Sequence, residues 1–292
     1  MQNKKLKTEI SELLTLKTVS NAYAEISSIR MGKIRNAVLV NRVFLDSINA
    51  IFKDVLASYS YELAENLKSK KKKQKITFLA HNGKTVAVYL SANTGLYGEI
   101  VGKTFNMFLR ESETPGVEIT VVGKLGRTLF EQSRPGVEFS YFDFPDYQIS
   151  EDAWGKIVGH LVPYQEIDIY YGKYKSVVTQ EADVYKITAP SPYEDVVKKT
   201  PAKLPPKYIF EPSLDEVMMF FETEIFTSTF EQVLRENQLA KFASRITAMT
   251  KASDNISLLL KKRELEHLRL SHYQENKKQI NSASYLAFSD GN

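Results

Sequence analysis

The sequence predicts an α/β protein in which a long antiparallel coiled coil, made of the N- and C-terminal helices, is joined to a central α/β domain. Three observations lead to this prediction. Apolar residues recur at helical spacing near both ends of the 292-residue chain, glycine and proline are almost absent from those two stretches, and helix and strand signals alternate between them.

The C-terminal stretch from Leu214 to Leu286 is predicted to be a single helix. No glycine or proline occurs between Ser213 and Asp290, and a pattern this long exceeds the usual globular helix. At a rise of about 1.5 Å per residue the helix would be on the order of 100 Å long, so one domain cannot bury it and it needs a partner helix or a surrounding protein. Its apolar stripe comprises Leu239, Phe242, Ile246, Met249, Ile256 and Leu260.

The N-terminal stretch from Lys4 to Leu56 supplies a candidate partner helix. It has no proline and a single glycine, Gly32, and its apolar residues also recur at helical spacing. The two chain ends are therefore expected to pair in antiparallel orientation. Small residues, which let two backbones approach closely, lie where the helices would meet: Ala22, Ala24, Ser27 and Ser28 on one, and Ala240, Ala243, Ser244, Ala248, Ala252 and Ser253 on the other.

The middle of the chain alternates between strand and helix signals, which is typical of a sheet with helices packed against it. We expect a Rossmann-like domain here. Asn82 and Gly83 favour a hairpin between its first two strands, and Ser150 is the expected N-cap of its last helix. The expected strands are 76–80, 85–90, 117–122, 137–142, 166–173 and 175–187, and the expected helices are 98–110, 125–132 and 151–161.

These signals divide the chain into four segments. Residues 1–66 form the N-terminal coiled-coil helix and 67–190 the central α/β domain. Residues 191–212 are rich in proline and are predicted to form a linker, and residues 213–292 are predicted to form the C-terminal coiled-coil helix.

Composition limits the classes of function. The chain lacks cysteine, so it has no disulfide framework and no thiolate metal site. No apolar run is long enough to span a membrane, and the N-terminus lacks the apolar core of a signal peptide. The net charge is +4. The dense lysine run from Lys68 to Lys75 is consistent with a solvated linker or with contact to nucleic acid or anionic lipid.

No catalytic constellation is apparent, and no cofactor is expected. Gly102, Lys103 and Thr104 match the end of a phosphate-binding loop, but Tyr97 stands where that motif needs its first glycine. The four histidines are scattered and lack metal-ligand spacing. The basic turn from Gly123 to Arg127 is consistent either with an anion site at a helix start or with a turn that needs glycine dihedrals. The residues point to a noncatalytic protein.

Several motifs, in order along the chain, resemble the gamma subunit of rotary F-type ATP synthases. Phe242 to Met249, followed by Lys251 to Asn255, is similar to the family's Ala-Ala-Arg-Met-Thr-Ala-Met signature and the Asp-Asn run after it. The resemblance covers essentially the whole chain. Further similar segments are Ser27 to Lys33, Ser91 to Gly98, Gly123 to Phe130, Tyr171 to Ser176 and Tyr208 to Pro212.

The resemblance implies a central stalk that couples ion-driven rotation to ATP synthesis or hydrolysis in the catalytic subunits. The expected partners are the ring of alpha and beta subunits, the epsilon subunit and the c-ring, with no nucleic acid and with membrane contact only through the complex. The complex is expected on the cytoplasmic face of the cell membrane. An asymmetric shaft inside the ring would favour a different set of open and closed sites at each angle.

The resemblance also implies where partners touch this chain. Contacts with the catalytic-subunit ring are expected at Arg30, Met31, Lys33, Arg245, Met249 and Arg269, with Arg245 and Arg269 in angle-dependent ion pairs. The c-ring is expected near Lys207, Tyr208 and Glu211.

The chain departs from the family pattern at some positions. Tyr23 stands where methionine is usual, and Leu270 where glutamine is usual. Residues Ala283 to Leu286 replace a Gly-Ala-Ala-Ala tail. Two alternatives therefore stay open: a rotor-like subunit of a repurposed F-type relative, for example one used in motility, and a coiled-coil scaffold or nucleic-acid adaptor.

Overall fold

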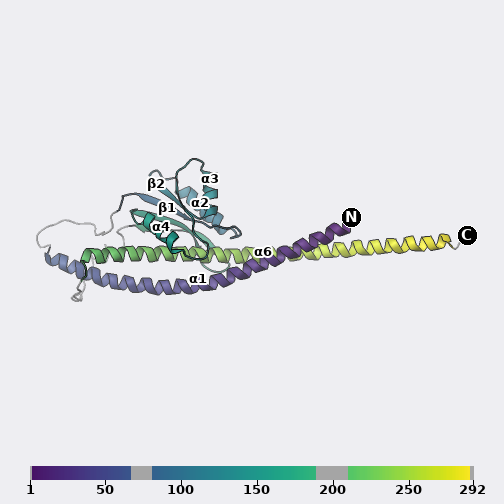
Figure 1. Ribbon diagram of the computed structural model, residues 1–292, viewed down its shortest axis with the longest axis horizontal. Coiled ribbons are helices and arrows are strands. Elements are labelled where there is room, and N and C mark those ends of the chain that lie inside the picture. The colour runs from purple at the N-terminus through teal and green to yellow at the C-terminus, as the bar shows by residue number, and fades with distance from the viewer. Residues whose placement is uncertain (1, 67–80, 189–209, 290–292) are drawn as a thin grey trace. The chain divides into compact units, whose positions relative to one another are not determined.

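The computed structural model describes residues 2–66, 81–188 and 210–289. The chain forms two compact units, one of Met1–Ser28 with Arg245–Asn292 and one of Ile29–Ser244. Two long helices, α1 (Gln2–Asn66) and α6 (Leu214–Ser289), contribute residues to both units (Figure 1). The predicted strand at 76–80, the lysine run and most of the proline-rich linker lie outside the described residues.

The unit formed by residues 29–244 contains a sheet of five strands in the order β3-β2-β1-β4-β5. The first four strands in this order are parallel, and β5 is antiparallel to β4. The α/β architecture predicted for the centre of the chain is confirmed. Its elements are β1 (Thr85–Leu90), α2 (Ile100–Glu111), β2 (Val117–Val122), α3 (Lys124–Ser133), β3 (Ser140–Phe142), α4 (Glu151–Leu161), β4 (Glu166–Tyr174) and β5 (Gln180–Thr188).

Two local predictions need correction. Strand β1 has β2 on one edge and β4 on the other, both parallel, so it does not pair in the hairpin that Asn82 and Gly83 suggested. Helix α2 begins at Ile100, two residues after the predicted start at Gly98. Leu96 and Gly98 have φ values of 67° and 62°, and such left-handed dihedrals cannot belong to a right-handed helix.

Strand alternation separates two apolar faces of the sheet. On one face, Tyr89 of β1 and Tyr170 of β4 surround Phe108 of α2, with ring centroids 5.3 Å and 5.5 Å from it. On the other face, Val88 and Leu90 belong to a cluster that also includes residues of α4 and α6. Helix α6 thus forms part of the layer that covers this second face.

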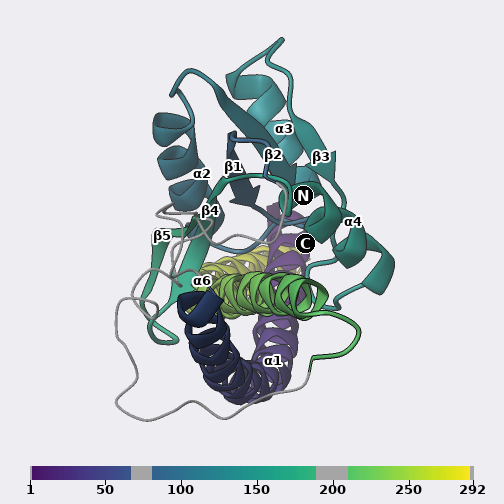
Figure 2. The same ribbon diagram turned by 90° about the vertical axis from the view of Figure 1, so that its left-hand side faces the viewer.

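Within residues 29–244, α6 lies between the sheet and α1 (Figure 2). Phe52 and Val55 of α1 pack with Met218 of α6. The rings of Phe52 and Phe221 are 5.3 Å apart, and the Asn41 side chain donates a hydrogen bond of 3.1 Å to the Ser228 carbonyl oxygen. This stretch of α6 is therefore enclosed on two sides.

The other unit consists of the two chain ends. Asn3 donates a hydrogen bond of 3.1 Å to Gln274, Glu9 lies 3.5 Å from Arg263, and the Arg245 guanidinium carbon lies 5.7 Å from the centre of the Tyr23 ring. Residue numbers rise on one helix as they fall on the other, so the segments run antiparallel at these points. A coiled coil along their whole length stays a prediction. In the part of the chain that the structure describes, no helix is long and apolar enough to cross a bilayer.

Candidate functional site

The strand order reverses between β1 and β4, and the carboxyl edge of the sheet at this point is the expected place for a ligand. The chain leaves β1 toward β2 on one side, while β4 lies on the other side. In doubly wound sheets, ligands bind in the crevice at such a reversal of strand order.

Helix α6 occupies this crevice through Asn237. The regular pairing of β1 with β4 ends at Tyr89 and Tyr170. Beyond that point the Asn237 amide group donates a hydrogen bond of 3.2 Å to the Leu90 carbonyl oxygen, and its oxygen accepts one of 2.9 Å from the Gly172 N–H. A side chain from the helix therefore bridges the two strands as a peptide group would.

Gly172 permits this close approach. A Cβ atom at this position would lie 2.8 Å from Ile100 Cγ1, 3.2 Å from Ala240 Cβ and 3.3 Å from the Asn237 oxygen. Because these distances are shorter than ordinary van der Waals contacts, a side chain here would push α6 away from the sheet.

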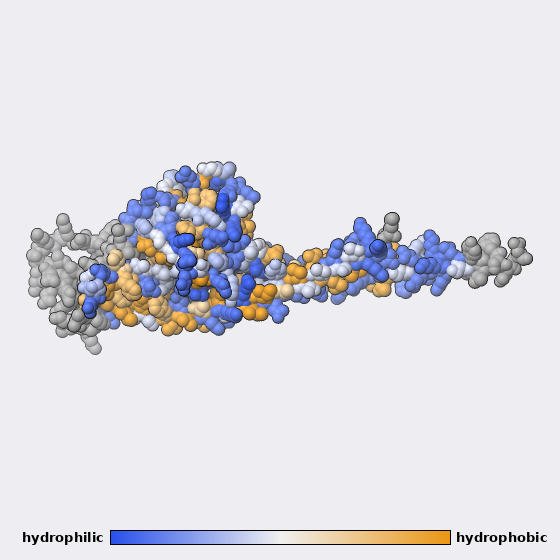
Figure 3. Space-filling view, in the orientation of Figure 1, coloured by the Kyte–Doolittle hydropathy of each residue, from blue (hydrophilic) through white to orange (hydrophobic). Residues whose placement is uncertain are grey.

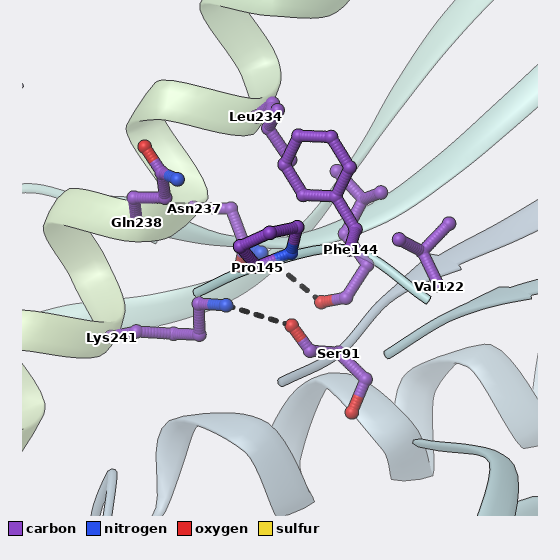
Figure 4. A pocket seen from close by; sticks show the side chains of 9 residues that line it. Ser91, Val122, Phe144, Pro145, Leu234, Asn237, Gln238 and Lys241 are labelled. Atoms are coloured by element: carbon purple, nitrogen blue, oxygen red, sulfur yellow. Dashed lines mark hydrogen bonds between the residues drawn. The ribbon is translucent and has the colours of Figure 1, made fainter. Parts of the chain in front are cut away.

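One helical turn further along, Lys241 anchors α6 to two loops. Its ammonium nitrogen lies 2.8 Å from the Ser91 carbonyl oxygen and 3.1 Å from an Asp146 carboxylate oxygen. The side chains of Lys241 and Asp146 are only 5% and 10% exposed. Figure 4 shows Lys241 and Asn237 on the same face of the helix, directed at the edge of the sheet. This is a buried ion pair between distant parts of the sequence.

Asp146 also binds the loop that follows β1. Its carboxylate accepts hydrogen bonds of 3.0 Å from the backbone N–H groups of Asn93 and Thr94, and one of 2.9 Å from the Thr94 hydroxyl group. Burial by itself raises the pKa of Asp146, but the positive charge of Lys241 and the Asn93 N–H outweigh it and leave the pKa below its usual value. Asp146 is therefore held as a carboxylate in the buried network.

This network uses the groups that a phosphate ligand would need. The backbone N–H groups at the end of β1 donate to Asp146, and Lys103 pairs with Glu99 at 2.9 Å. The cavity lined by Leu90, Ser91, Asn237 and Lys241 has a volume of about 10 Å³, which is room for about one water molecule. The crevice is a junction between helix and sheet, and a nucleotide does not fit in it.

The basic turn before α3 is also engaged within the chain. Gly123 has a φ of 102° and its N–H donates to the Phe142 carbonyl oxygen at 2.9 Å. Lys124 lies 3.2 Å from Asp143, and Arg127 lies 2.8 Å from Glu131. Of the two interpretations, this geometry favours a turn that needs glycine dihedrals and does not favour an anion site. Among the described residues, no group of three or more His, Asp or Glu side chains is placed to hold a metal ion.

The ring-contact residues predicted on α1 differ in their surroundings. The Arg30 guanidinium carbon lies 4.9 Å from the centre of the Tyr147 ring and 5.9 Å from that of Phe242. Met31 is buried at 9% exposure, and Lys33 is exposed. Arg30 therefore holds the Tyr147 loop, and Lys33 offers its charge to solvent.

The predicted residues on α6 differ in the same way. Arg245 is 4% exposed and lies against Tyr23. Met249 is half-buried and Arg269 is exposed. Of the residues predicted to lie near the c-ring, Glu211 is exposed, while Lys207 and Tyr208 lie outside the described residues. The ring-contact residues are divided between the two units, with those of α1 in one and those of α6 in the other.

Sequence reasoning missed the junction residues Asn237, Lys241, Asp146 and Gly172. A signal was present on α6, because Phe230, Val233 and Leu234 begin an apolar face on which Asn237 and Lys241 continue the same helical spacing. Polar residues on the continuation of a buried face indicate specific hydrogen-bond partners. The partners themselves are distant in sequence and could not be identified from that pattern.

A second polar cluster lies away from the junction. The Lys84 ammonium group donates a hydrogen bond of 2.6 Å to Glu118, and the Tyr164 hydroxyl group donates to the same carboxylate. His160 Nε2 lies 3.0 Å from the Thr120 hydroxyl oxygen. Burial lowers the pKa of His160, although Glu118 opposes the shift. The cluster therefore favours a neutral His160.

Residues 2–270 match the sequence model of a family described as ATP synthase. Similar curated proteins include the ATP synthase gamma chain of Ruthia magnifica subsp. Calyptogena magnifica, which is 22% identical over 280 residues covering 90% of each chain. The ATP synthase gamma chain of Clostridium novyi strain NT is 23% identical over 276 residues, covering 91% of this chain and 90% of the relative.

Solved structures share the fold. The cryo-EM structure of the central stalk and c-ring of Tetrahymena thermophila mitochondrial ATP synthase contains a similar chain, with a TM-score of 0.56, 16% identity and coverage of 80% of this chain and 99% of that one. The Euglena gracilis mitochondrial ATP synthase, in a structure of its OSCP, F1 part and c-ring, contains another, with a TM-score of 0.51, 16% identity and coverage of 88% and 93%.

Proposed function

The chain belongs to the ATP synthase family of gamma chains, and from this membership we propose that it is the noncatalytic rotor subunit of an F-type complex. The observation that carries the proposal is the family match over residues 2–270, together with gamma-chain relatives that align over about nine-tenths of their own length. The match includes α1, the α/β domain and α6 as far as Leu270, so it supports a role for most of the chain.

The proposed mechanism follows from how α6 is built. Residues 214–244 of this helix belong to the same compact unit as the sheet, and the helix continues without a break to Ser289. A helix held at one end by an α/β domain and paired with α1 at the other would form an antiparallel coiled-coil shaft. Inside a ring of alternating subunits, such a shaft would interact differently with each catalytic site and so favour different open and closed states at each angle.

Exposed apolar side chains on α1 support the proposal that the chain binds other subunits. They include Ile29 at 57%, Val40 at 70% and Val43 at 67% exposure, and Figure 3 shows apolar surface along the lower side of the helical part of the molecule. Apolar surface of this kind marks contacts with other proteins. The proposed partners are the alpha and beta subunits of the ring, the epsilon subunit and the c-ring.

The predicted contact residues divide by exposure into two proposed roles. Lys33 and Arg269 are exposed and would present their charges to acidic loops of the ring. Arg30, Met31, Arg245 and Met249 are buried or half-buried and would shape the shaft beneath that surface. Lys207, Tyr208 and Glu211 are proposed to lie near the c-ring, with residues 67–190 as the foot of the stalk, residues 191–212 as a linker and the segments 1–66 and 213–292 as the shaft.

Copurification tests the proposal. The tagged full chain, expressed in its native cell and extracted with mild detergent, is expected to bring down alpha, beta, epsilon and c subunits from the cytoplasmic face of the cell membrane, together with ATPase activity. Recovery of ring subunits without a c-ring would indicate a repurposed rotor instead. Recovery of no ring subunits, or ATP turnover by the purified chain alone, would overturn the assignment.

The role of the exposed shaft charge is tested separately. Arg269→Ala in the assembled complex, alone or with Arg245→Ala, is expected to lower torque and coupled ATP synthesis, because it removes a charge-assisted contact with the ring. Lys156→Ala, which removes an exposed charge from α4 of the α/β domain and not from the shaft, is the matched control. Equal torque and synthesis in the control and in both Arg269 variants would contradict the proposed contact.

A further inference from the structure

We propose that Asn237 and Lys241 are positioning residues that fix the rotation of α6 about its own axis relative to the α/β domain, so that torque passes between them. This inference rests on the proposed rotor function and deepens it. It assigns a mechanical role to the junction between helix and sheet, where the crevice of a doubly wound sheet is filled by the helix instead of a ligand.

Apolar packing alone gives α6 little resistance to rotation about its own axis at this junction. Phe230, Val233 and Leu234 of α6 belong to the cluster on the second face of the sheet, and the rings of Phe230 and Trp154 are stacked with centroids 5.1 Å apart. The free energy of such burial depends mainly on area and not on orientation. Resistance to twisting therefore requires contacts whose strength depends on angle.

The polar contacts supply that angular dependence at two successive turns of the helix. Asn237 engages Leu90 of β1 and Gly172 of β4, so a rotation of α6 would break both hydrogen bonds together. Lys241 engages Ser91 and Asp146 at a position four residues later on the same face. Directional contacts spaced along the helix oppose both rotation and sliding.

The charge pair connects three segments of the chain. Asp146 lies in the loop after β3. Its carboxylate accepts hydrogen bonds from the Asn93 and Thr94 N–H groups in the loop after β1 and from Lys241 of α6. The Lys241 nitrogen also lies 5.4 Å from the centre of the Tyr97 ring. Because Lys241 and Asp146 are nearly excluded from water, screening by salt weakens their attraction less than that of surface pairs. Load on either loop is therefore transmitted to the helix.

The test measures torque in the assembled complex. The natural chain has no cysteine, so Asp152→Cys, at an exposed position in the first turn of α4, provides one attachment point on the α/β domain. A magnetic bead at this cysteine reports the torque that reaches the domain when the surface-immobilised ring hydrolyses ATP. ATP hydrolysis by the same complexes is measured in solution without load.

Lys241→Met is expected to keep unloaded ATP hydrolysis near the parent rate and to lower the torque at the bead by about half or more, since a buried charge loses its partner. Lys241→Arg, which keeps the positive charge, is expected to restore most of the torque. Lys186→Met is the matched control, because Lys186 is exposed and pairs with Asp168 between β4 and β5. Parent-level torque in Lys241→Met would overturn the proposal.

A gentler variant keeps the test decisive if Lys241→Met fails to fold. Lys241→Gln retains donors for Ser91 and Asp146 but lacks the charge, and it is expected to give torque between those of the parent and the Met variant. Parent-level torque in a folded Lys241→Gln complex would also contradict the proposed role of Lys241 in fixing the rotation of α6. If the parent complex neither assembles nor rotates, the proposed function is wrong. If it rotates normally and the Lys241 variants have parent-level torque, only the role of Lys241 is wrong.

Discussion

Helix α6 passes through two different environments, and their contrast shows how one helix can be both an anchor and an exposed shaft. From Asn237 to Arg245 every residue is buried, including Gln238, Lys241 and Ser244. From Ile246 to Ser282 only Ser253 and Leu260 are buried. The first stretch is held inside its own chain, whereas the second leaves most of its surface for partners.

The ion pairs of the two regions differ in the same way. Lys241 and Asp146 are almost fully buried, whereas Arg263 and Glu9, in the unit of the two chain ends, are 41% and 35% exposed. Removing one member of a buried pair leaves an uncompensated charge, but removing one member of an exposed pair leaves a charge that water solvates. The buried pair therefore specifies one arrangement, and the exposed pair contributes little to stability.

The largest expected effect comes from breaking the buried pair. Lys241→Met is expected to lower the free energy of unfolding by about 3–5 kcal/mol because Asp146 stays buried without its partner. Lys186→Met is expected to change it by less than about 1 kcal/mol, because the Lys186 side chain is 61% exposed and the pair is accessible to water. Urea unfolding of the full chain measures both, and equal effects would contradict the contrast between the two regions.

A smaller effect is expected from adding one methyl group at the junction. Gly172→Ala places a Cβ against Ile100 and Ala240 and is expected to cost about 1–3 kcal/mol through overpacking. Gly155→Ala in α4 is the matched control, since a Cβ added there would meet nothing within 4 Å. We expect the control to stabilise the protein by about 0.5–1 kcal/mol through helix propensity. Thermal unfolding in which Gly172→Ala matched Gly155→Ala would show that α6 has room to move.

The exposed pair at the chain ends should respond weakly. Glu9→Gln removes the partner of Arg263 across the two helices, while Glu266 remains 2.7 Å from Arg263. We expect a loss of less than about 1 kcal/mol at low salt, and a smaller loss at high salt because the charges are screened. A loss as large as that in Lys241→Met, independent of salt, would show that the exposed and buried pairs do not differ in their contribution to stability.

The smallest effect concerns pH at the cluster away from the junction. Burial lowers the folded-state pKa of His160, with Glu118 acting in the opposite direction. The unfolded chain then binds more protons than the folded one, so this contribution to stability is complete above about pH 6.5 and is lost as pH falls toward the folded pKa. His160→Gln should flatten the pH dependence of unfolding below about pH 6.5. An unchanged slope would show that His160 does not titrate on folding.

The elements with strong local signals could be predicted from the sequence. Strand β2 and helix α4 have the predicted bounds, and α6 begins at the predicted residue, because alternation and helical spacing are properties of neighbouring residues. Ser150 is the N-cap of α4, but its side chain makes no capping hydrogen bond. The partners of β1 were missed because Asn82 and Gly83 indicate only a local turn, whereas β1 pairs with strands far along the chain.

The junction could be predicted only in part for a related reason. Asn237 and Lys241 stand out as polar residues on a buried face, but Lys241 pairs with a residue 95 positions away. Helical spacing gives the face on which a residue lies and not the loop that meets it. The exposed contact residues were suggested by the family resemblance, and no property of a single chain identifies their partners.

Hydrogen exchange on the full chain, free and in the assembled complex, tests the central claim most directly. The amides of residues 237–245 are expected to be strongly protected in both states, because they open only when the junction unfolds. Those of residues 261–282 are expected to exchange faster in the free chain and to gain protection when the ring subunits are added. Equal protection of the two stretches in the free chain, with no change on assembly, would contradict the account of a locked anchor and an exposed shaft.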